Sequence, residues 1–237
     1  MPPTRPVRRL AAWLAALASV APLAGPASAW ADCGGVRRAA PQRWHRPYRP
    51  PLAIGDSTML FALPALAREG FSVDAHGCRQ FGEALQLLRR LAAGRVLPHL
   101  TVIALGADGA ITRRDIQSTV AILGPRRTLV LVTPLELGGS AGSDAATVRD
   151  EARRHPDRIH LLDWVRYSAG HAGWFQPDHL HLTFAGADAF ARLLRQALPL
   201  AAPPPAPSPP APAPTLTLTP IRAGFGDPDQ VVLGPTT

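Results

Sequence analysis

Two short stretches of this 237-residue sequence carry side chains that together could perform nucleophilic catalysis. Ser57 lies between two apolar runs in LAIGDSTML (52–60), and QPDHLHLTFAG (176–186) places Asp178 three residues before His181. A serine hydroxyl is a weak nucleophile unless a base takes its proton. Residues three apart in a turn or helix start can share a side, so Asp178 can accept the Nδ1–H of His181. That pairing leaves Nε2 free to take the serine proton.

Each of these features also has a simpler interpretation. Asp, Ser and Thr are the usual N-caps of helices, so GDST (55–58) could do no more than begin a helix. His179 competes with His181 as the base, but it adjoins Asp178, and adjacent side chains generally point away from each other. These three residues could instead hold a metal ion, yet the sequence has no evident fourth ligand cluster, and we expect no metal.

The elements that must position these residues follow from an alternation of short apolar runs with helical patterns. Five runs are typical of buried strands: 51–55, 71–76, 100–105, 128–133 and 159–164. Amphipathic segments separate them, as in FGEALQLLRRLAAG (81–94), whose apolar residues recur at i, i+3, i+4 and i+7. The alternation predicts an α/β fold, a three-layer αβα sandwich around a five-stranded parallel sheet. Its doubly wound form has strand order 2-1-3-4-5.

In such a sheet, ligands bind beyond the carboxyl ends of the strands, where the strand order reverses. The first three predicted strands are neighbours there, and the loops that follow them contain Ser57, Gly77 and Asp108. The topology therefore predicts that these three residues gather at one edge of the sheet. Ser57 would also open a helix, whose N-terminal amides and dipole favour a developing anion.

Four blocks of the sequence resemble the SGNH (GDSL-like) hydrolases, in the order in which that superfamily carries them. The blocks are GDS at 55–57, Gly77, GAD at 106–108 and DHLH at 178–181. Longer stretches are most similar to the extracellular SGNH domain of peptidoglycan O-acetyltransferases and related stand-alone esterases. Those stretches are DAHGCRQF, LGADGAIT and DWVRYSAGHAGWFQPDHLHLTFAGADAFA.

The resemblance covers about 51–200 and implies a flavodoxin-like αβα sandwich that works through an acyl-enzyme. Carried over position by position, it makes Ser57 the nucleophile, His181 the base and Asp178 the residue that orients the base. It further implies that the backbone N–H groups of Ser57 and Gly77 donate to the oxyanion.

One position departs from the superfamily. Its third block supplies an Asn whose side chain donates to the oxyanion, and Asp108 stands there in this chain. An ionised Asp only accepts hydrogen bonds, and losing one oxyanion donor typically slows a reaction about 10²–10³-fold. Three hypotheses follow for Asp108. It is protonated in an apolar site and donates, or it turns away and two backbone donors suffice, or the site is degraded and only binds.

These residues predict a serine esterase that acts on O-acyl groups, foremost O-acetyl groups, of envelope carbohydrate and needs no cofactor. An O-acetyltransferase with the same triad and a sugar acceptor is the first alternative. A non-catalytic carbohydrate- or cell-wall-binding protein is the second. Removing residues 1–31 takes three positive charges from the net charge of +8 and leaves +5, a modest excess that is typical of a solvated surface, so we expect no nucleic-acid partner.

The first 31 residues predict export. Arg5, Arg8 and Arg9 precede a short apolar run, and small-x-small sites follow it, which is the pattern of a secretory signal peptide over 1–31. We expect no membrane span after its cleavage, because prolines interrupt the apolar run. The protein would then be periplasmic or extracellular.

The remaining chain divides by composition. Residues 32–50 are an Arg- and Pro-rich leader expected to be extended, 51–200 form the predicted domain, and 201–237 are a Pro/Ala-rich tail expected to be mostly disordered. Cys33 and Cys78 could form a disulfide in an oxidising compartment or remain free, and the sequence leaves both open.

Overall fold

The computed structural model describes residues 33–136, 138–139 and 141–203. The predicted signal peptide (1–31) lies outside these residues, as does most of the predicted tail (201–237). Over the described stretches, no helix combines the length and the apolar character needed to cross a membrane.

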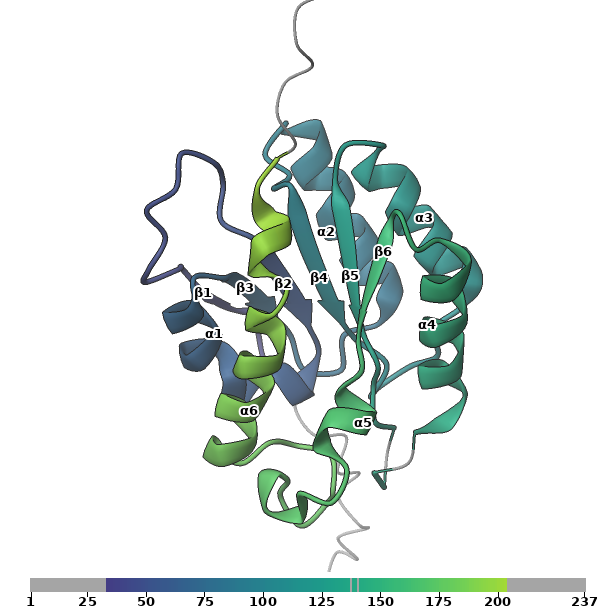
Figure 1. The fold of residues 1–237 in the computed structure, drawn as a ribbon. Coiled ribbons are helices and arrows are strands. Elements are labelled where there is room, and N and C mark those ends of the chain that lie inside the picture. Colours follow the sequence, from purple (N-terminus) through teal and green to yellow (C-terminus); the bar gives the residue numbers. More distant parts are fainter. Residues whose placement is uncertain (1–32, 137, 140, 204–237) are drawn as a thin grey trace, which may run out of the picture. The chain divides into compact units, whose positions relative to one another are not determined.

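A six-stranded sheet forms the middle layer, in the order β1-β3-β2-β4-β5-β6 (Figure 1). All neighbouring strands from β3 to β6 in this order are parallel. The strands are β1 (Arg37–Ala39), β2 (Leu52–Gly55), β3 (Ser72–Ala75), β4 (Leu100–Ala104), β5 (Thr128–Val132) and β6 (Ile159–Leu162). The predicted α/β class and the relative order of the five parallel strands are confirmed. Every residue of β2 and β4 is buried. This is typical of a parallel sheet, because helices cover both of its faces.

The prediction of a five-stranded, wholly parallel sheet was wrong by one strand. The additional strand β1 comes from the segment 32–50 and pairs antiparallel with β3 at the edge of the sheet. Its sequence, RRA, has no apolar alternation and is mostly exposed. Long-range contacts hold it in place: Arg38 Nε donates to Asp74 Oδ2 over 2.6 Å. The disulfide between Cys33 and Cys78, with Cα atoms 5.4 Å apart, fixes the chain just before the strand.

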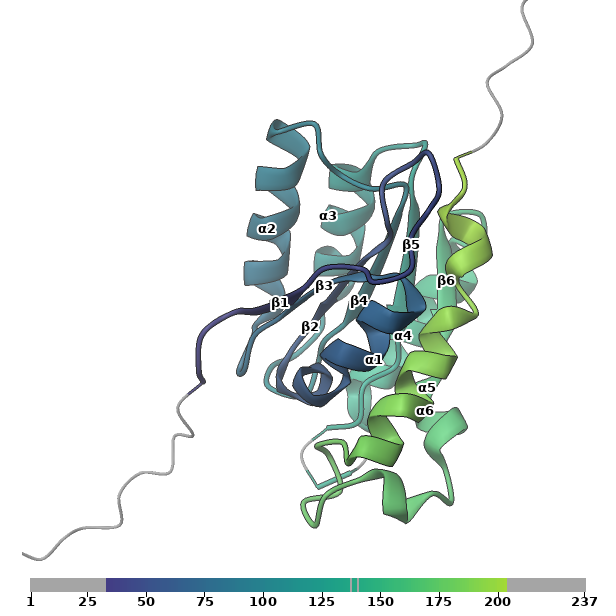
Figure 2. The ribbon, with the colours of Figure 1, turned by 90° about the vertical axis from the view of Figure 1, so that its left-hand side faces the viewer.

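Helices cover both faces of the sheet. Helices α2, α3 and α4 pack on one face through buried residues such as Leu88, Ile116 and Val148. Helices α1 and α6 pack on the other face through Leu66 and Phe190, and Figure 2 shows them across the strands from α2 and α3. The bounds are α1 (Leu63–Glu69), α2 (Phe81–Ala93), α3 (Arg113–Leu123), α4 (Gly142–Arg154), α5 (Trp164–Ser168), α6 (Phe184–Arg195), η1 (Ser57–Ala62), η2 (Ala172–Trp174) and η3 (Leu198–Ala201).

Strand register brings the ends of the three central strands level with one another. Gly55 at the end of β2 lies opposite Ala75 of β3 and Ala104 of β4. The loops that follow these strands therefore begin side by side, at the lower edge of the sheet in Figure 1. This edge is where a doubly wound sheet binds its ligands.

The long connection between β6 and α6 is ordered by aromatic packing. Trp164 is buried and stacks on Trp174, with ring centroids 5.8 Å apart and an interplanar angle of 14°. A bridge between Phe175 and Leu182 then closes the segment into a compact turn. The turn that carries the Asp-x-x-His block is thus anchored to the core at both ends.

The disulfide is expected to contribute substantially to stability, because it closes a loop with a sequence separation of 45 and holds the edge strand. Replacing Cys33 and Cys78 together by Ser should lower the free energy of unfolding by about 2–4 kcal/mol. Urea denaturation followed by circular dichroism measures this difference. Reduced wild-type protein is the control and should match the double variant. Equal unfolding midpoints for oxidised wild type and double variant would contradict the prediction.

Candidate active site

Ser57 is the first residue of η1, directly beyond the carboxyl end of β2. The helix cap is Asp56, whose side chain accepts the Thr58 N–H over 3.1 Å, so the Ser57 hydroxyl has no capping role. Glycine is needed at position 55, because a Cβ atom there would lie 2.6 Å from the Cβ of Met59. The turn thus presents the serine hydroxyl toward the segment 176–182.

A continuous hydrogen-bonded chain joins Ser57, His181 and Asp178. The Nε2 atom of His181 lies 3.0 Å from the Oγ of Ser57, and its Nδ1 lies 2.7 Å from Asp178 Oδ2. If Nδ1 carries the ring proton and donates it to the carboxylate, Nε2 is left as an acceptor for the serine proton. The geometry is that of a Ser-His-Asp triad.

Backbone donors fix the Asp178 carboxylate in place. Its Oδ1 accepts the N–H groups of Leu180 and His181, each over 3.0 Å. Burial acts to raise the pKa of Asp178, but the hydrogen bonds from His181 and from these amides outweigh it and bring the pKa below its ordinary value. The carboxylate therefore stays ionised beside the imidazole.

The competing histidine, His179, is exposed, and its backbone lies in the left-handed region with φ 59°. Its neighbour two positions on, His181, makes the contacts to serine and aspartate. Among the described residues there is no group of three or more His, Cys, Asp or Glu side chains placed to hold a metal ion.

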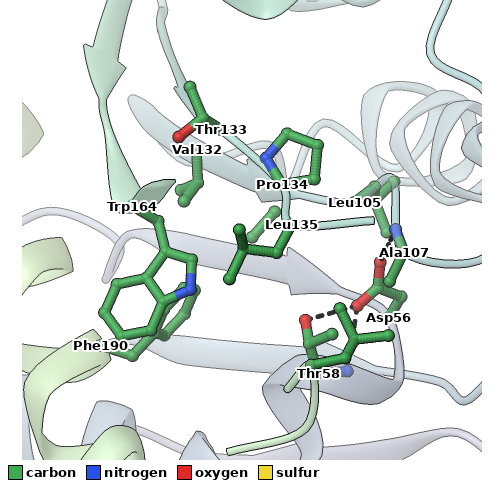
Figure 3. Close-up of a pocket in the computed structure, with 12 residues that line it drawn as sticks. Asp56, Thr58, Leu105, Ala107, Val132, Thr133, Pro134, Leu135, Trp164 and Phe190 are labelled. Atoms are coloured by element: carbon green, nitrogen blue, oxygen red, sulfur yellow. Dashed lines mark hydrogen bonds between the residues drawn. The ribbon is translucent and has the colours of Figure 1, made fainter. Parts of the chain in front are cut away.

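Asp56 connects the serine turn to the loop after β4. Its Oδ1 accepts the Thr58 N–H over 3.1 Å and the Thr58 hydroxyl over 2.7 Å, while Oδ2 accepts the Ala107 N–H over 3.1 Å (Figure 3). The side chain is buried, which raises the pKa of Asp56, and these hydrogen bonds oppose the rise. Asp56 thus holds Ser57 and the GAD segment (106–108) at a fixed separation.

A small pocket lies beneath this connection, between the sheet and α6 (Figure 3). Apolar side chains such as Leu135, Trp164 and Phe190 line most of it, and Asp56 and Thr58 form its polar side. Its free space is about that of one water molecule. Neither Ser57 nor His181 lines it, so a substrate must approach the serine from the open side.

Asp108 lies next to Ser57. Its Oδ2 is 3.3 Å from the Oγ of Ser57, and its backbone carbonyl accepts the Nε2–H of Gln80 over 2.6 Å. The single hydroxyl proton of Ser57 thus has two neighbouring acceptors, His181 and Asp108. Because Asp108 is exposed, its surroundings are not the apolar site on which the protonated-acid hypothesis depends.

Gly77 lies buried in the loop after β3, held by the disulfide. A Cβ atom at position 77 would collide with the carbonyl oxygen of Cys33, so the close approach of the bonded leader requires glycine here. The loop is further fixed by Arg79, a buried side chain that donates to Asp74 Oδ1 over 2.5 Å and to its carbonyl over 2.7 Å.

The supporting residues were not predicted from the sequence. Asp56 was visible as the middle residue of the GDS block, but its link to Ala107 joins residues 51 positions apart. Arg79 and Gln80 come two and three residues after Gly77, and no local pattern distinguishes them from surface residues. Their roles become apparent only when the loops lie side by side.

A Ser-His-Asp chain at the carboxyl edge of this sheet is the arrangement of the SGNH (GDSL) hydrolases. The C-terminal catalytic domain of peptidoglycan O-acetyltransferase A (OatA) of Streptococcus pneumoniae, solved with a methylsulfonyl adduct, is similar with a TM-score of 0.58 and 26% identity. The match covers 65% of this chain and 94% of that domain. A lipase/acylhydrolase of Enterococcus faecalis shares the fold with a TM-score of 0.53 and 16% identity, over 67% of this chain and all of that one.

Sequence similarity leads to the same group. YrhL of Bacillus subtilis, which carries the name of a peptidoglycan O-acetyltransferase, is 27% identical over 150 residues, or 62% of this chain. The chain spans about a quarter of that relative, 23% of its length. No protein-family model matches the sequence. The chain is thus similar in sequence to peptidoglycan O-acetyltransferases and in fold to the catalytic domain of one of them.

Replacing Asp108 by Asn is expected to accelerate ester cleavage. Asn adds an N–H donor beside the oxyanion and removes a charge that repels it, so kcat/KM for p-nitrophenyl acetate should rise about tenfold or more. Asp108→Ala is the matched control, because it removes the charge without adding a donor and should give a smaller gain. An Asp108→Asn protein that is slower than wild type would show that the carboxylate serves the reaction.

Proposed function

We propose that this protein is a serine esterase that removes O-acyl groups, foremost O-acetyl groups, from envelope carbohydrate. The observation that carries the proposal is the chain of contacts from Ser57 Oγ to His181 Nε2 (3.0 Å) and from His181 Nδ1 to Asp178 (2.7 Å). Support for the substrate class comes from the homologues, which are peptidoglycan O-acetyltransferases.

In the first half-reaction, Ser57 Oγ attacks the ester carbonyl carbon while His181 Nε2 takes the hydroxyl proton. The ionised Asp178 stabilises the imidazolium that results. The tetrahedral intermediate then collapses, its bond to the sugar oxygen breaks, and His181 returns the proton to that oxygen. An acetyl group remains on Ser57 as an ester.

In the second half-reaction, the acceptor of the acyl group determines the outcome. His181 deprotonates a water molecule, which attacks the acetyl-Ser57 carbonyl, and acetate leaves as Ser57 recovers its proton. If a sugar hydroxyl takes the place of water, the same steps transfer the acetyl group. The O-acetyltransferase is therefore the closest alternative, since both reactions use one triad and one intermediate.

The oxyanion of both half-reactions requires donors at the edge of the sheet. We assign the backbone N–H groups of Ser57 and Gly77 to this role, because both follow the level ends of adjacent strands. Asp108 adds an acceptor where the superfamily has a donor. Its charge favours a second alternative, in which the protein binds wall carbohydrate without turnover.

Export is part of the proposal. The signal-peptide pattern over 1–31 supports it, and so does the disulfide between Cys33 and Cys78, since disulfides persist in oxidising compartments.

A serine-directed reagent distinguishes the esterase from the binding protein. Methanesulfonyl fluoride should form a covalent adduct on Ser57, because sulfonylation requires an activated hydroxyl. Intact-mass analysis and peptide mapping measure the adduct. Ser57→Ala should abolish it and His181→Ala should slow it about 10²-fold or more, while Ser72→Ala is a control serine in β3 that should change nothing. An unlabelled wild type that still binds wall glycan would establish the binding role.

Product analysis separates hydrolysis from transfer. With O-acetylated peptidoglycan fragments as substrate and an excess of unacetylated oligosaccharide, we expect free acetate to account for most of the acetyl groups lost. Mass spectrometry of the oligosaccharides and an enzymatic acetate assay quantify the two products, with Ser57→Ala as the blank. If most of the acetyl groups lost from the substrate appear on the oligosaccharide, the protein is an O-acetyltransferase and the proposed esterase activity is wrong.

A further inference from the structure

Two phenylalanine side chains stand out on the surface of the described residues. In that part of the chain, the exposed large apolar side chains are Val36 (41% exposed), Phe61 (46%) and Phe184 (80%). The two phenylalanines contact each other, with ring centroids 5.6 Å apart and an interplanar angle of 64°. Leaving both rings in water forgoes the free energy of burying them, so a contacting exposed pair is a candidate binding surface.

The pair is carried by the helix that begins at Ser57 and the helix that follows His181. Phe61 is four residues after Ser57 in the same 3-10 helix, which places its backbone about 8 Å along the helix axis. Phe184 is three residues after His181 and is the first residue of α6. The helices that carry the two rings therefore each begin at or near a reacting side chain.

Both rings are carried on fixed backbone. Thr183 caps α6 by accepting the Gly186 N–H over 3.2 Å and donates its hydroxyl to the Gly173 carbonyl over 2.9 Å. On the other side, Met59 and Ala62 bury η1 against the core on either side of Phe61. The exposure of the rings thus results from the fold itself and not from a loose chain.

The form of this surface fits a sugar ring better than its alternatives. An acyl chain is held in an enclosed apolar pocket, whereas the apolar pocket that Asp56 and Thr58 line among the described residues has room for about one water molecule. A stable dimer needs a broad buried area, and in the described part of the chain Phe61 and Phe184 are two of three exposed large apolar side chains. A pyranose ring presents C–H groups on its faces and hydroxyls around its rim, so it can stack on an open aromatic surface and keep its hydroxyls in water.

We propose that Phe61 and Phe184 form a subsite that stacks against a pyranose ring of the acylated glycan and so holds its ester at Ser57. This inference rests on the proposed function. The subsite confers a preference for acylated oligosaccharides over small esters, because a small ester reaches Ser57 without touching the rings. Its contribution appears in KM, since stacking on the sugar is the same before and during the reaction at the carbonyl.

The test compares two substrates in single and double alanine variants. For O-acetylated peptidoglycan fragments, Phe61→Ala and Phe184→Ala should each raise KM about threefold or more, and the double variant about tenfold or more, with kcat little changed. For p-nitrophenyl acetate, kcat/KM should stay within about twofold of wild type. Phe184→Trp should retain the low KM for the glycan, because it keeps an aromatic face. Val36→Ala is the matched control at an exposed apolar position and should change neither substrate.

Binding to the Ser57→Ala protein separates this inference from the proposed function. If calorimetry shows that unacetylated oligosaccharide binds Ser57→Ala and that the double phenylalanine change weakens this binding, the subsite stands even where wild type turns over no ester. If the phenylalanine variants lose kcat/KM equally on the glycan and on p-nitrophenyl acetate, the proposed sugar subsite is wrong, because the rings would then support the triad itself. If the phenylalanine variants lose kcat/KM selectively on p-nitrophenyl octanoate, the two rings bind an acyl chain and the proposed sugar subsite is wrong. Dissociation of a dimer by Phe184→Ala, seen in sedimentation, overturns it in favour of self-association.

Discussion

The buried carboxylate of Asp56 is the interaction on which the site depends. It receives three hydrogen bonds, two from Thr58 and one from Ala107, and so joins the turn after β2 to the turn after β4. A buried charge is costly unless its oxygens are satisfied, and these donors meet that requirement only when both turns hold their positions. The same contacts begin η1 at Ser57 and bring the loop of Asp108 beside it.

His181 reaches this turn from a distant part of the chain. Ser57 and His181 are separated by 124 positions, and aromatic packing from Trp164 to Trp174 supports the segment that brings them together. Within that segment the Asp178 carboxylate binds two backbone amides as well as the imidazole. The Ser-His-Asp arrangement therefore combines a local Asp–His pair with a separate serine turn. Packing of both segments against the core sets their relative position.

Charge and covalent geometry shape the other side of Ser57. The disulfide presses the backbone of Cys33 against Gly77, which fixes the loop that we assign to the oxyanion. Asp108 places a carboxylate 3.3 Å from the serine hydroxyl, at a position where negative charge opposes the reaction. The exposed pair of Phe61 and Phe184 is carried by the helix that begins at Ser57 and the helix that follows His181, so the proposed sugar subsite is separate from the groups that would break the ester bond.

The sequence by itself determined the layered α/β fold and the order of its parallel strands, because apolar runs and amphipathic segments are local patterns that follow from backbone periodicity. It also indicated Ser57, Asp178 and His181 through residue type and spacing. Only the tertiary structure decided that RRA at 37–39 is a sixth strand and that Cys33 is bonded to Cys78. It also placed Asp108 in water beside the serine. These features depend on contacts between residues far apart in the chain, whose energies no local pattern encodes.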